Sequence, residues 1–220
     1  MHTARDLLAR AYGDLSAVLS SLTAEEGWQP TGCAGWTPVD LGFHLLGDAR
    51  RALVALATPA AAPADTDAVS YWTAWRPPAP GDDEELWSTR IAASTQGGLP
   101  GIAGRYAETA AAVGVAAGRV DPAERVRTQG RVLTVADLLS TLVVEAAVHH
   151  LDLVAHLDRP GPVEEPLAEV RRVLEALAGG PPPARWDDAT AARRGTGRER
   201  LTAADRLELG PVAARFPLFG

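Results

Sequence analysis

Apolar residues recur along most of the chain at the three- and four-residue spacing of amphipathic helices. The first such stretch covers residues 4–22, and its stripe consists of Leu7, Leu8, Ala11, Tyr12, Leu15, Val18, Leu19 and Leu22. A stripe of this kind buries one helix face and leaves the other in solvent. We therefore predict a first helix that packs on a core along its whole length.

A second helix is predicted from Thr37 to about Leu56. Thr37 suits the N-cap, Pro38 suits the first turn, and Asp40 follows the cap by three residues, as in a capping box. Apolar side chains occupy most sides of this stretch, so we expect it to be deeply packed.

The next part of the chain is less regular. Residues 58–83 are rich in Ala, Pro and Asp and predict a long loop, a feature that is often functional in a compact domain. A third helical region is predicted over about 84–118, and the glycines and proline of residues 96–101 must break or kink it. Residues 121–131 are interpreted as a polar connection.

A fourth helix is predicted from Thr134 to about Leu157, with Asp137 completing a second capping-box candidate. One face of this helix carries a seam with steps of four and three residues, formed by Leu138, Leu142, Glu145, His149, Asp152 and His156. The seam begins apolar and becomes ionisable in its second half.

Beyond a Pro/Gly-rich break at 159–166, the pattern predicts a helix over 167–177 and short helices near 188–194 and 203–209. Four main helices joined by loops predict an all-α protein with an antiparallel four-helix bundle. We assign the bundle to residues 1–158. Residues 159–220 are predicted to form a C-terminal helix and an extended tail that packs on the bundle.

Composition narrows the possible partners. The 220 residues carry a net charge of −7, and clustered basic residues are absent from the sequence, so we expect no nucleic-acid partner. The single cysteine, Cys33, rules out an intrachain disulfide and suits a reducing compartment. An apolar signal segment and an 18-residue uncharged apolar run are also missing. We expect a cytoplasmic monomer or homodimer with no membrane partner.

The ionisable half of the seam has two interpretations. It forms a solvated face near the helix end, or it points inward among apolar neighbours, which are Val144, Val148, Leu151 and Ala155. Buried charges must be paired or must bind a metal. Glu145 and His149 lie one turn apart and can reach one ion, and their chemistry suits Zn²⁺.

A third metal ligand would have to come from another helix. His44 lies in the second predicted helix, where a lone imidazole among apolar residues is ordinarily a hydrogen-bonded core residue. With Glu145 and His149 it would complete a three-ligand site that leaves a coordination position open, as in catalytic zinc sites. Asp152, one turn beyond His149, is placed to hold the outer ring N–H or to contact a ligand.

Two segments resemble a known family. They are Gly32-Cys33-Ala34-Gly35-Trp36-Thr37-Pro38-Val39-Asp40-Leu41, followed by His44, and Glu145-Ala146-Ala147-Val148-His149-His150-Leu151-Asp152-Leu153. The first resembles the start of the second helix in mycothiol-dependent maleylpyruvate isomerase N-terminal domains, which belong to the DinB-like metalloenzyme superfamily. The second is similar to the Glu-x-x-x-His-His-x-Asp pattern of that family. The resemblance covers about residues 4–158.

The resemblance implies a bundle that holds a divalent metal, usually zinc, through His44, Glu145 and His149. It also implies mycothiol, the low-molecular-weight thiol of actinobacteria, as cosubstrate. The expected enzyme is a transferase or isomerase that adds a metal-bound thiolate to a small electrophilic substrate, with Asp152 orienting. Two alternatives stay open: a metal-dependent hydrolase or lyase that uses a metal-bound water, and a non-catalytic metal-binding DinB-like protein.

Three further sets of residues are candidates for the pocket. Trp72 and Trp75, in the predicted loop, are expected to line the substrate or thiol cavity. An arginine of the tail would pair with an anionic substrate, the candidates being Arg193, Arg194 and Arg198. Cys33 is interpreted as a small packed apolar residue rather than as a nucleophile.

Overall fold

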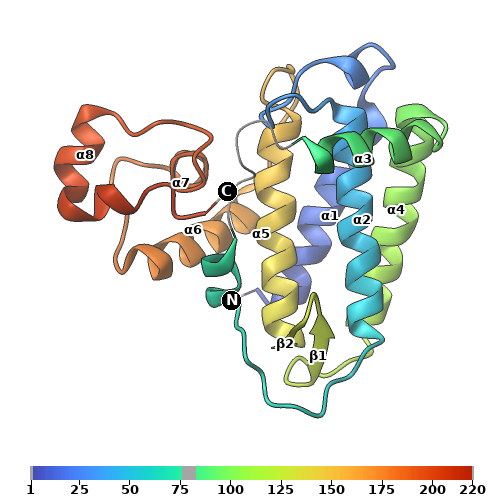
Figure 1. Ribbon diagram of the computed structural model, residues 1–220, viewed down its shortest axis with the longest axis horizontal. Helices are drawn as coiled ribbons and strands as arrows, with labels where there is room; N and C mark the ends of the chain where they lie inside the picture. The colour runs from blue at the N-terminus through green and yellow to red at the C-terminus, as the bar shows by residue number, and fades with distance from the viewer. Residues whose placement is uncertain (1, 76–82, 220) are drawn as a thin grey trace.

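Four long helices form the body of the protein, and shorter helices lie beside them (Figure 1). The computed structural model describes residues 2–75 and 83–219. The bundle helices are α1 (Ala4–Ser21), α2 (Pro38–Leu56), α4 (Gly98–Ala117) and α5 (Val135–Leu153). The predicted all-α fold with a four-helix bundle is confirmed. Of the predicted 58–83 loop, residues 76–82 lie outside the described residues.

Contacts between residues near the helix ends show in which direction each bundle helix runs. A Cβ on Gly42 near the start of α2 would touch Leu19 near the end of α1 and Ile102 near the start of α4. Helices α2 and α4 therefore run in the same direction, and α1 runs against both. Pro59, just after α2, bridges to Val126, which lies between α4 and α5. Helix α5 accordingly starts at the end of the bundle where α2 and α4 finish.

The connection between α2 and α4 accounts for this parallel pair. It contains the 3₁₀ helix η2 (Ser70–Ala74) and helix α3 (Glu84–Ser94), which carry the chain back to the end where α2 began (Figure 1). The predicted break in the third helical region falls between α3 and α4, where Gly97 has φ 80°. The last short element at this end is η1 (Glu26–Trp28), between α1 and α2.

Capping side chains start α2 and α5 at the predicted threonines, Thr37 and Thr134. The Thr37 side chain accepts from the Asp40 N–H, and the Asp40 carboxylate accepts from the Thr37 N–H, so the predicted capping box is complete. At Thr134 the side chain accepts from the Asp137 N–H, while the backbone of Thr134 is paired in a strand. Half of the second predicted box therefore forms.

The predicted polar connection at 121–131 joins α4 to α5 and also forms most of a β-hairpin, which was not predicted. Strands β1 (Arg125–Thr128) and β2 (Arg131–Thr134) pair antiparallel, with Val126 opposite Leu133. The turn residues Gln129 and Gly130 have φ 48° and 77°, the positive values of a tight hairpin turn. Each strand has four residues, too few for alternation to stand out among the arginines.

Helix α5 ends at Leu153, four residues before the predicted Leu157. The Asp152 carbonyl accepts from the Gly32 N–H at 2.8 Å, and the His150 ring contacts the Pro160 carbonyl at 3.1 Å. These contacts draw the end of the helix into the neighbouring loops. His156 consequently lies beyond the helix and is exposed.

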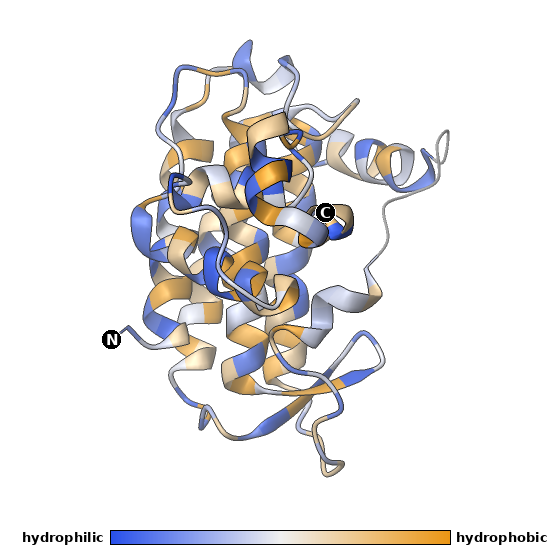
Figure 2. Ribbon diagram, turned by 90° about the vertical axis from the view of Figure 1, so that its left-hand side faces the viewer, coloured by the Kyte–Doolittle hydropathy of each residue, from blue (hydrophilic) through white to orange (hydrophobic). Residues whose placement is uncertain are grey.

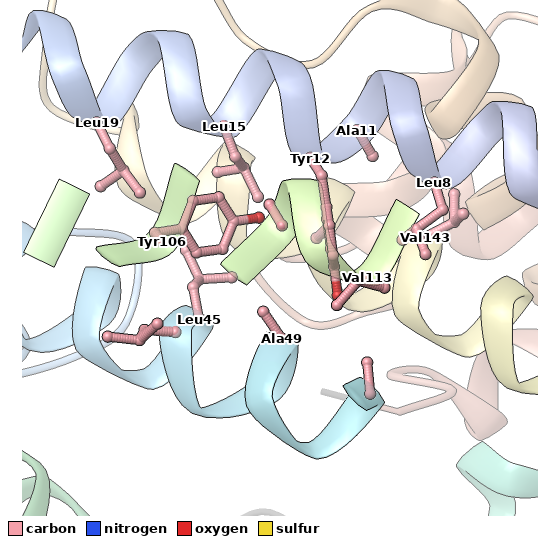
Figure 3. Packing of buried hydrophobic residues seen from close by; sticks show 14 of the residues in the cluster. Leu8, Ala11, Tyr12, Leu15, Leu19, Leu45, Ala49, Tyr106, Val113 and Val143 are labelled. Atoms are coloured by element: carbon pink, nitrogen blue, oxygen red, sulfur yellow. The ribbon is translucent and has the colours of Figure 1, made fainter. Parts of the chain in front are cut away.

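The main apolar core fills the space between the bundle helices. Figure 3 shows α1 presenting Leu8, Tyr12, Leu15 and Leu19 to α4 and α2, and all four are buried. The Tyr12 and Tyr106 rings meet edge to face, with centroids 5.8 Å apart. Along the helices, apolar and polar residues occur within the same turns, as expected for helices with one buried face (Figure 2).

The C-terminal region adds α6 (Glu164–Ala178), α7 (Asp188–Gly195), α8 (Ala203–Leu209) and the 3₁₀ helix η3 (Gly210–Arg215). A second apolar cluster joins α6 to the outer face of α5 and includes Val144, Val148, Leu167, Val170 and Val173. Phe219 stacks on Trp72 of η2 with ring centroids 4.4 Å apart. Within the described residues, none of the helices is long and apolar enough to cross a membrane.

Candidate metal centre

Three ionisable side chains converge where α2 and α5 face each other. His44 comes from α2, and Glu145 and His149 come from successive turns of α5. Glu145 Oε1 lies 3.7 Å from His44 Nε2 and 3.6 Å from His149 Nε2. Ligand atoms of all three residues lie within 4.8 Å of one another. Glu145, His149 and Asp152 of the predicted seam therefore point into the molecule, whereas His156 is exposed.

The donor set and its spacing fit a divalent cation. With Zn–N and Zn–O bonds of about 2.0–2.2 Å, tetrahedral ligand atoms stand roughly 3.3–3.6 Å apart, close to the two measured separations. His44 Nε2 is buried and has no hydrogen-bond partner among the described residues. A buried polar atom without a partner is costly, and a metal bond would satisfy it. Two imidazoles and one carboxylate are a ligand set that leaves a position open.

Asp152 holds the far side of the His149 ring. Its Oδ2 lies 3.0 Å from His149 Nδ1, so Nε2 is left to face Glu145. Arg198 donates to both oxygens of Asp152, with Nε 3.0 Å from Oδ1 and Nη2 2.9 Å from Oδ2. A carboxylate on the outer nitrogen fixes the orientation of a metal-binding imidazole and raises its basicity. The predicted place of Asp152 beside His149 agrees with this geometry.

Burial and charge act against each other at these groups. Burial raises the pKa of the Glu145 carboxyl, but the nearby imidazoles of His149 and His44 more than offset it and hold that pKa well below its ordinary value. Burial likewise raises the pKa of Asp152, but hydrogen bonds with His149 and Arg198 outweigh burial and hold that pKa well below its ordinary value. Burial lowers the pKa of His149, yet Asp152, Cys33 and Glu145 raise it above the ordinary value. Two anionic carboxylates therefore flank this imidazole.

His44 has polar neighbours of its own. Its Nδ1 lies 3.5 Å from Oε1 of Glu85 on α3, and its Nε2 lies 3.4 Å from Oδ2 of Asp48, one turn along α2. The Trp36 ring meets the His44 ring edge to face at 5.5 Å. The imidazole is thus positioned by α2, α3 and the loop that precedes α2. Glu85 belongs to α3, whose sequence shows no spacing that would relate it to His44.

A cavity of about 430 Å³ opens beside the three converging residues. Trp36 and Trp75 supply its aromatic walls, and Arg198 supplies a cation. Its other lining residues are Gly32, Cys33, Ala34, Leu41, His44, Glu85, Glu145, His149, Thr196 and Gly197. The C-terminal region thus reaches the site through the segment that follows α7.

Only some of the residues predicted to line the pocket lie at the cavity. Trp75 lines the cavity, whereas Trp72 is buried against Phe219 and is not among the lining residues. Arg194 pairs with Glu199 and Asp205 and does not line the cavity either. Of the three arginines considered in the tail, Arg198 is the one that reaches the site.

The sequence predicts apolar packing for Cys33, but in the structure its thiol also has polar neighbours. Its Sγ lies 3.3 Å from Asp152 Oδ2 and 3.9 Å from His149 Nδ1, and it lines the cavity. Cys33 also packs against the apolar core, as expected for a small apolar residue. The polar contacts depend on how α5 approaches the loop before α2, which one stretch of sequence does not reveal.

One comparison with known proteins gives a match. The sequence model described as the mycothiol maleylpyruvate isomerase N-terminal domain matches residues 8–154. That range runs from within α1 to just past the end of α5 and includes all three converging residues. Neither the curated proteins nor the solved structures contain a match.

Proposed function

Since the chain belongs to the mycothiol maleylpyruvate isomerase N-terminal domain family, we propose that it is a metal-dependent enzyme that uses a low-molecular-weight thiol. The proposed reaction adds the sulfur of mycothiol to a small electrophile, as an S-transferase or an isomerase. The convergence of His44, Glu145 and His149 beside an open cavity is the observation that carries the proposal.

Each residue of the site has a proposed role. His44, Glu145 and His149 hold a divalent metal, with zinc the best match to two imidazoles and one carboxylate. Bound there, the metal would make a thiol ligand deprotonated at neutral pH, which supplies the nucleophile. Asp152 keeps His149 in the tautomer that directs Nε2 to the site.

The cavity walls suit a small substrate beside a thiol. Trp36 and Trp75 exclude water from one side and offer flat apolar surface. Arg198 brings a positive charge to the rim, although its hydrogen bonds to Asp152 occupy much of it. We propose a small, neutral or singly anionic electrophile as the second substrate.

Replacing His149 tests the proposal. We expect His149→Ala to lose stoichiometric metal and thiol-adduct formation together, because it removes a ligand and the partner of Asp152. His156→Ala is the matched control, since His156 is exposed beyond α5 and should leave both properties unchanged. Metal content by elemental analysis and adduct formation by mass spectrometry are the readouts. If His149→Ala keeps both metal and adduct formation, the proposal is wrong.

The thiol requirement separates this function from its rivals. Turnover that continues at the same rate without added mycothiol would instead indicate a hydrolase or lyase that activates water. A protein purified without metal whose melting temperature does not change on zinc addition would indicate a non-catalytic bundle. The proposed enzyme shows neither behaviour.

A further inference from the structure

The His149 ring has a second set of potential ligands on the side away from Glu145. Three donor atoms gather there: Cys33 Sγ, Asp152 Oδ2 and His149 Nδ1. They come from the loop before α2 and from the last two turns of α5. Glu145 faces the other ring nitrogen, Nε2, so the two groups share His149 but use different atoms of it.

The separations of these donors match those of ligands on one thiophilic cation. Oδ2 lies 3.0 Å from Nδ1 and 3.3 Å from Sγ, and Sγ lies 3.9 Å from Nδ1. Zinc bonds of about 2.3 Å to sulfur and about 2.0–2.1 Å to nitrogen and oxygen place tetrahedral ligands roughly 3.3–3.6 Å apart. Small side-chain shifts would therefore bring all three onto one ion.

The surroundings of Cys33 also favour a ligand role over simple packing. Its Sγ donates to a carboxylate oxygen and lines the cavity of about 430 Å³, so an ion can reach it from solvent. Asp152 is 1 % exposed, and Arg198 holds its Oδ1, which fixes the direction of Oδ2. The Arg198 cation also donates to Oδ2 at 2.9 Å and would have to rely on Oδ1 once an ion is bound.

We propose that Cys33, Asp152 and His149 Nδ1 form a second site for a thiophilic divalent cation, next to the His44–Glu145–His149 group. Binding breaks the S–H bond of Cys33 and the N–H bond of His149 Nδ1, releases two protons to solvent and forms metal–sulfur and metal–nitrogen bonds. Sulfur, nitrogen and oxygen ligands together select zinc, cobalt or cadmium over magnesium or calcium.

Cobalt(II) is a suitable probe, because a thiolate bound to it gives a charge-transfer absorption band in the near ultraviolet. Cys33 is the only cysteine of the chain, so the band reports this residue alone. The titration is done on the full chain without added thiols. The wild type is expected to develop the band on cobalt addition.

Two variants separate the sites. Cys33→Ser is expected to bind one equivalent of cobalt without the band, at the three-residue group. Glu145→Gln, which weakens that group and changes no atom of the second set, is expected to bind one equivalent with the band. His44→Ala serves as a second disruption of the first group, and thermal melting of each variant verifies folding.

The outcomes distinguish this inference from the proposed function. Absence of the band in the wild type at saturating cobalt overturns the second site and leaves the proposed function standing. A band that disappears in both Glu145→Gln and His44→Ala also overturns it, because Cys33 would then be a ligand of the first group. Failure of Cys33→Ser to bind cobalt overturns the three-residue group instead.

Discussion

Asp152 links more of the site than any other single residue described above. It contacts the imidazole of His149, the thiol of Cys33 and the guanidinium of Arg198, and it is 1 % exposed. Removing the charge of Asp152 leaves the positive charge of Arg198 partly uncompensated and weakens the hydrogen bond with His149 Nδ1. The hydrogen-bond network, not the ligand set alone, therefore determines how firmly the site is organised.

Asp152→Asn is expected to lower zinc affinity by about 10–100-fold, the usual cost of losing a carboxylate behind a ligand histidine. Competition with a chelator of known affinity measures the change. Glu85→Gln is the matched control: the Glu85 side chain is 67 % exposed and lies 3.5 Å from His44, so solvent screening should keep its effect small. Equal losses in both variants would contradict the special role of Asp152.

Gly32 allows the loop before α2 to approach α5 closely. A Cβ at this position would stand 2.5 Å from Asp152 Oδ1 and 3.0 Å from Asp152 Cα. Gly32→Ala is therefore expected to destabilise the fold by about 1–3 kcal/mol and to weaken zinc binding. A Cβ on Gly47, inside α2, meets nothing within 4 Å. Gly47→Ala should stabilise by about 0.5–1 kcal/mol, as measured by chemical denaturation. Similar destabilisation by both changes would refute the contact argument.

At the scale of elements, helix positions were largely predictable because their signals are local. The caps at Thr37 and Thr134 and the apolar spacing of α1 specify structure within a few residues of sequence. The break between α3 and α4 follows from glycines whose conformation ends a helix. Local signals of this kind do not depend on what packs where.

The hairpin and the end of α5 were not predictable in the same way. Strands β1 and β2 depend on pairing with each other and on the contact of Pro59 with Val126. The early end of α5 depends on Gly32, which lies more than a hundred positions away in the chain. At the site, the sequence shows the spacing of the proposed ligands on α5. Cys33, Glu85 and Arg198, by contrast, reach the cavity only through tertiary packing.

The hairpin turn gives a test at this scale. Gly130 has φ 77°, a conformation that costs a residue with a Cβ about 1–2 kcal/mol. Gly130→Ala is expected to lower stability by that amount in urea denaturation, with zinc affinity unchanged because the hairpin lies at the opposite end of α5 from His149. A stability equal to that of the wild type would show that the turn is not formed as described.

For the whole molecule, we propose that the bundle of residues 1–158 and the C-terminal region of residues 159–220 act as one folding unit. They share the apolar cluster around Val148 and Val170, and Arg198 is tied to Asp152. Within the C-terminal region, buried Asp205 accepts hydrogen bonds from Thr202, Trp186 and Arg194. This carboxylate ties α8 to the segments around it.

Asp205 predicts a specific response to acid. Burial raises its pKa, but the hydrogen bonds from Thr202 and Trp186 and the charge of Arg194 lower it from the ordinary 3.8 to about 2. Its contribution is therefore complete above about pH 4 and is lost as the pH falls toward 2. Asp205→Asn should cost about 2–4 kcal/mol at pH 7 and show a weaker dependence on pH below 4, by thermal melting. An unchanged pH profile would argue against this role.

The edge-to-face contact between Trp36 and His44 gives the site a built-in optical reporter. The indole lies 5.5 Å from an imidazole that is a proposed ligand, so events at that imidazole change the surroundings of an intrinsic fluorophore. Occupation of the site by a paramagnetic ion is expected to quench the Trp36 emission, because the indole lies next to a proposed ligand. Metal binding can thus be followed in real time by intrinsic tryptophan fluorescence, without a label and without an activity assay.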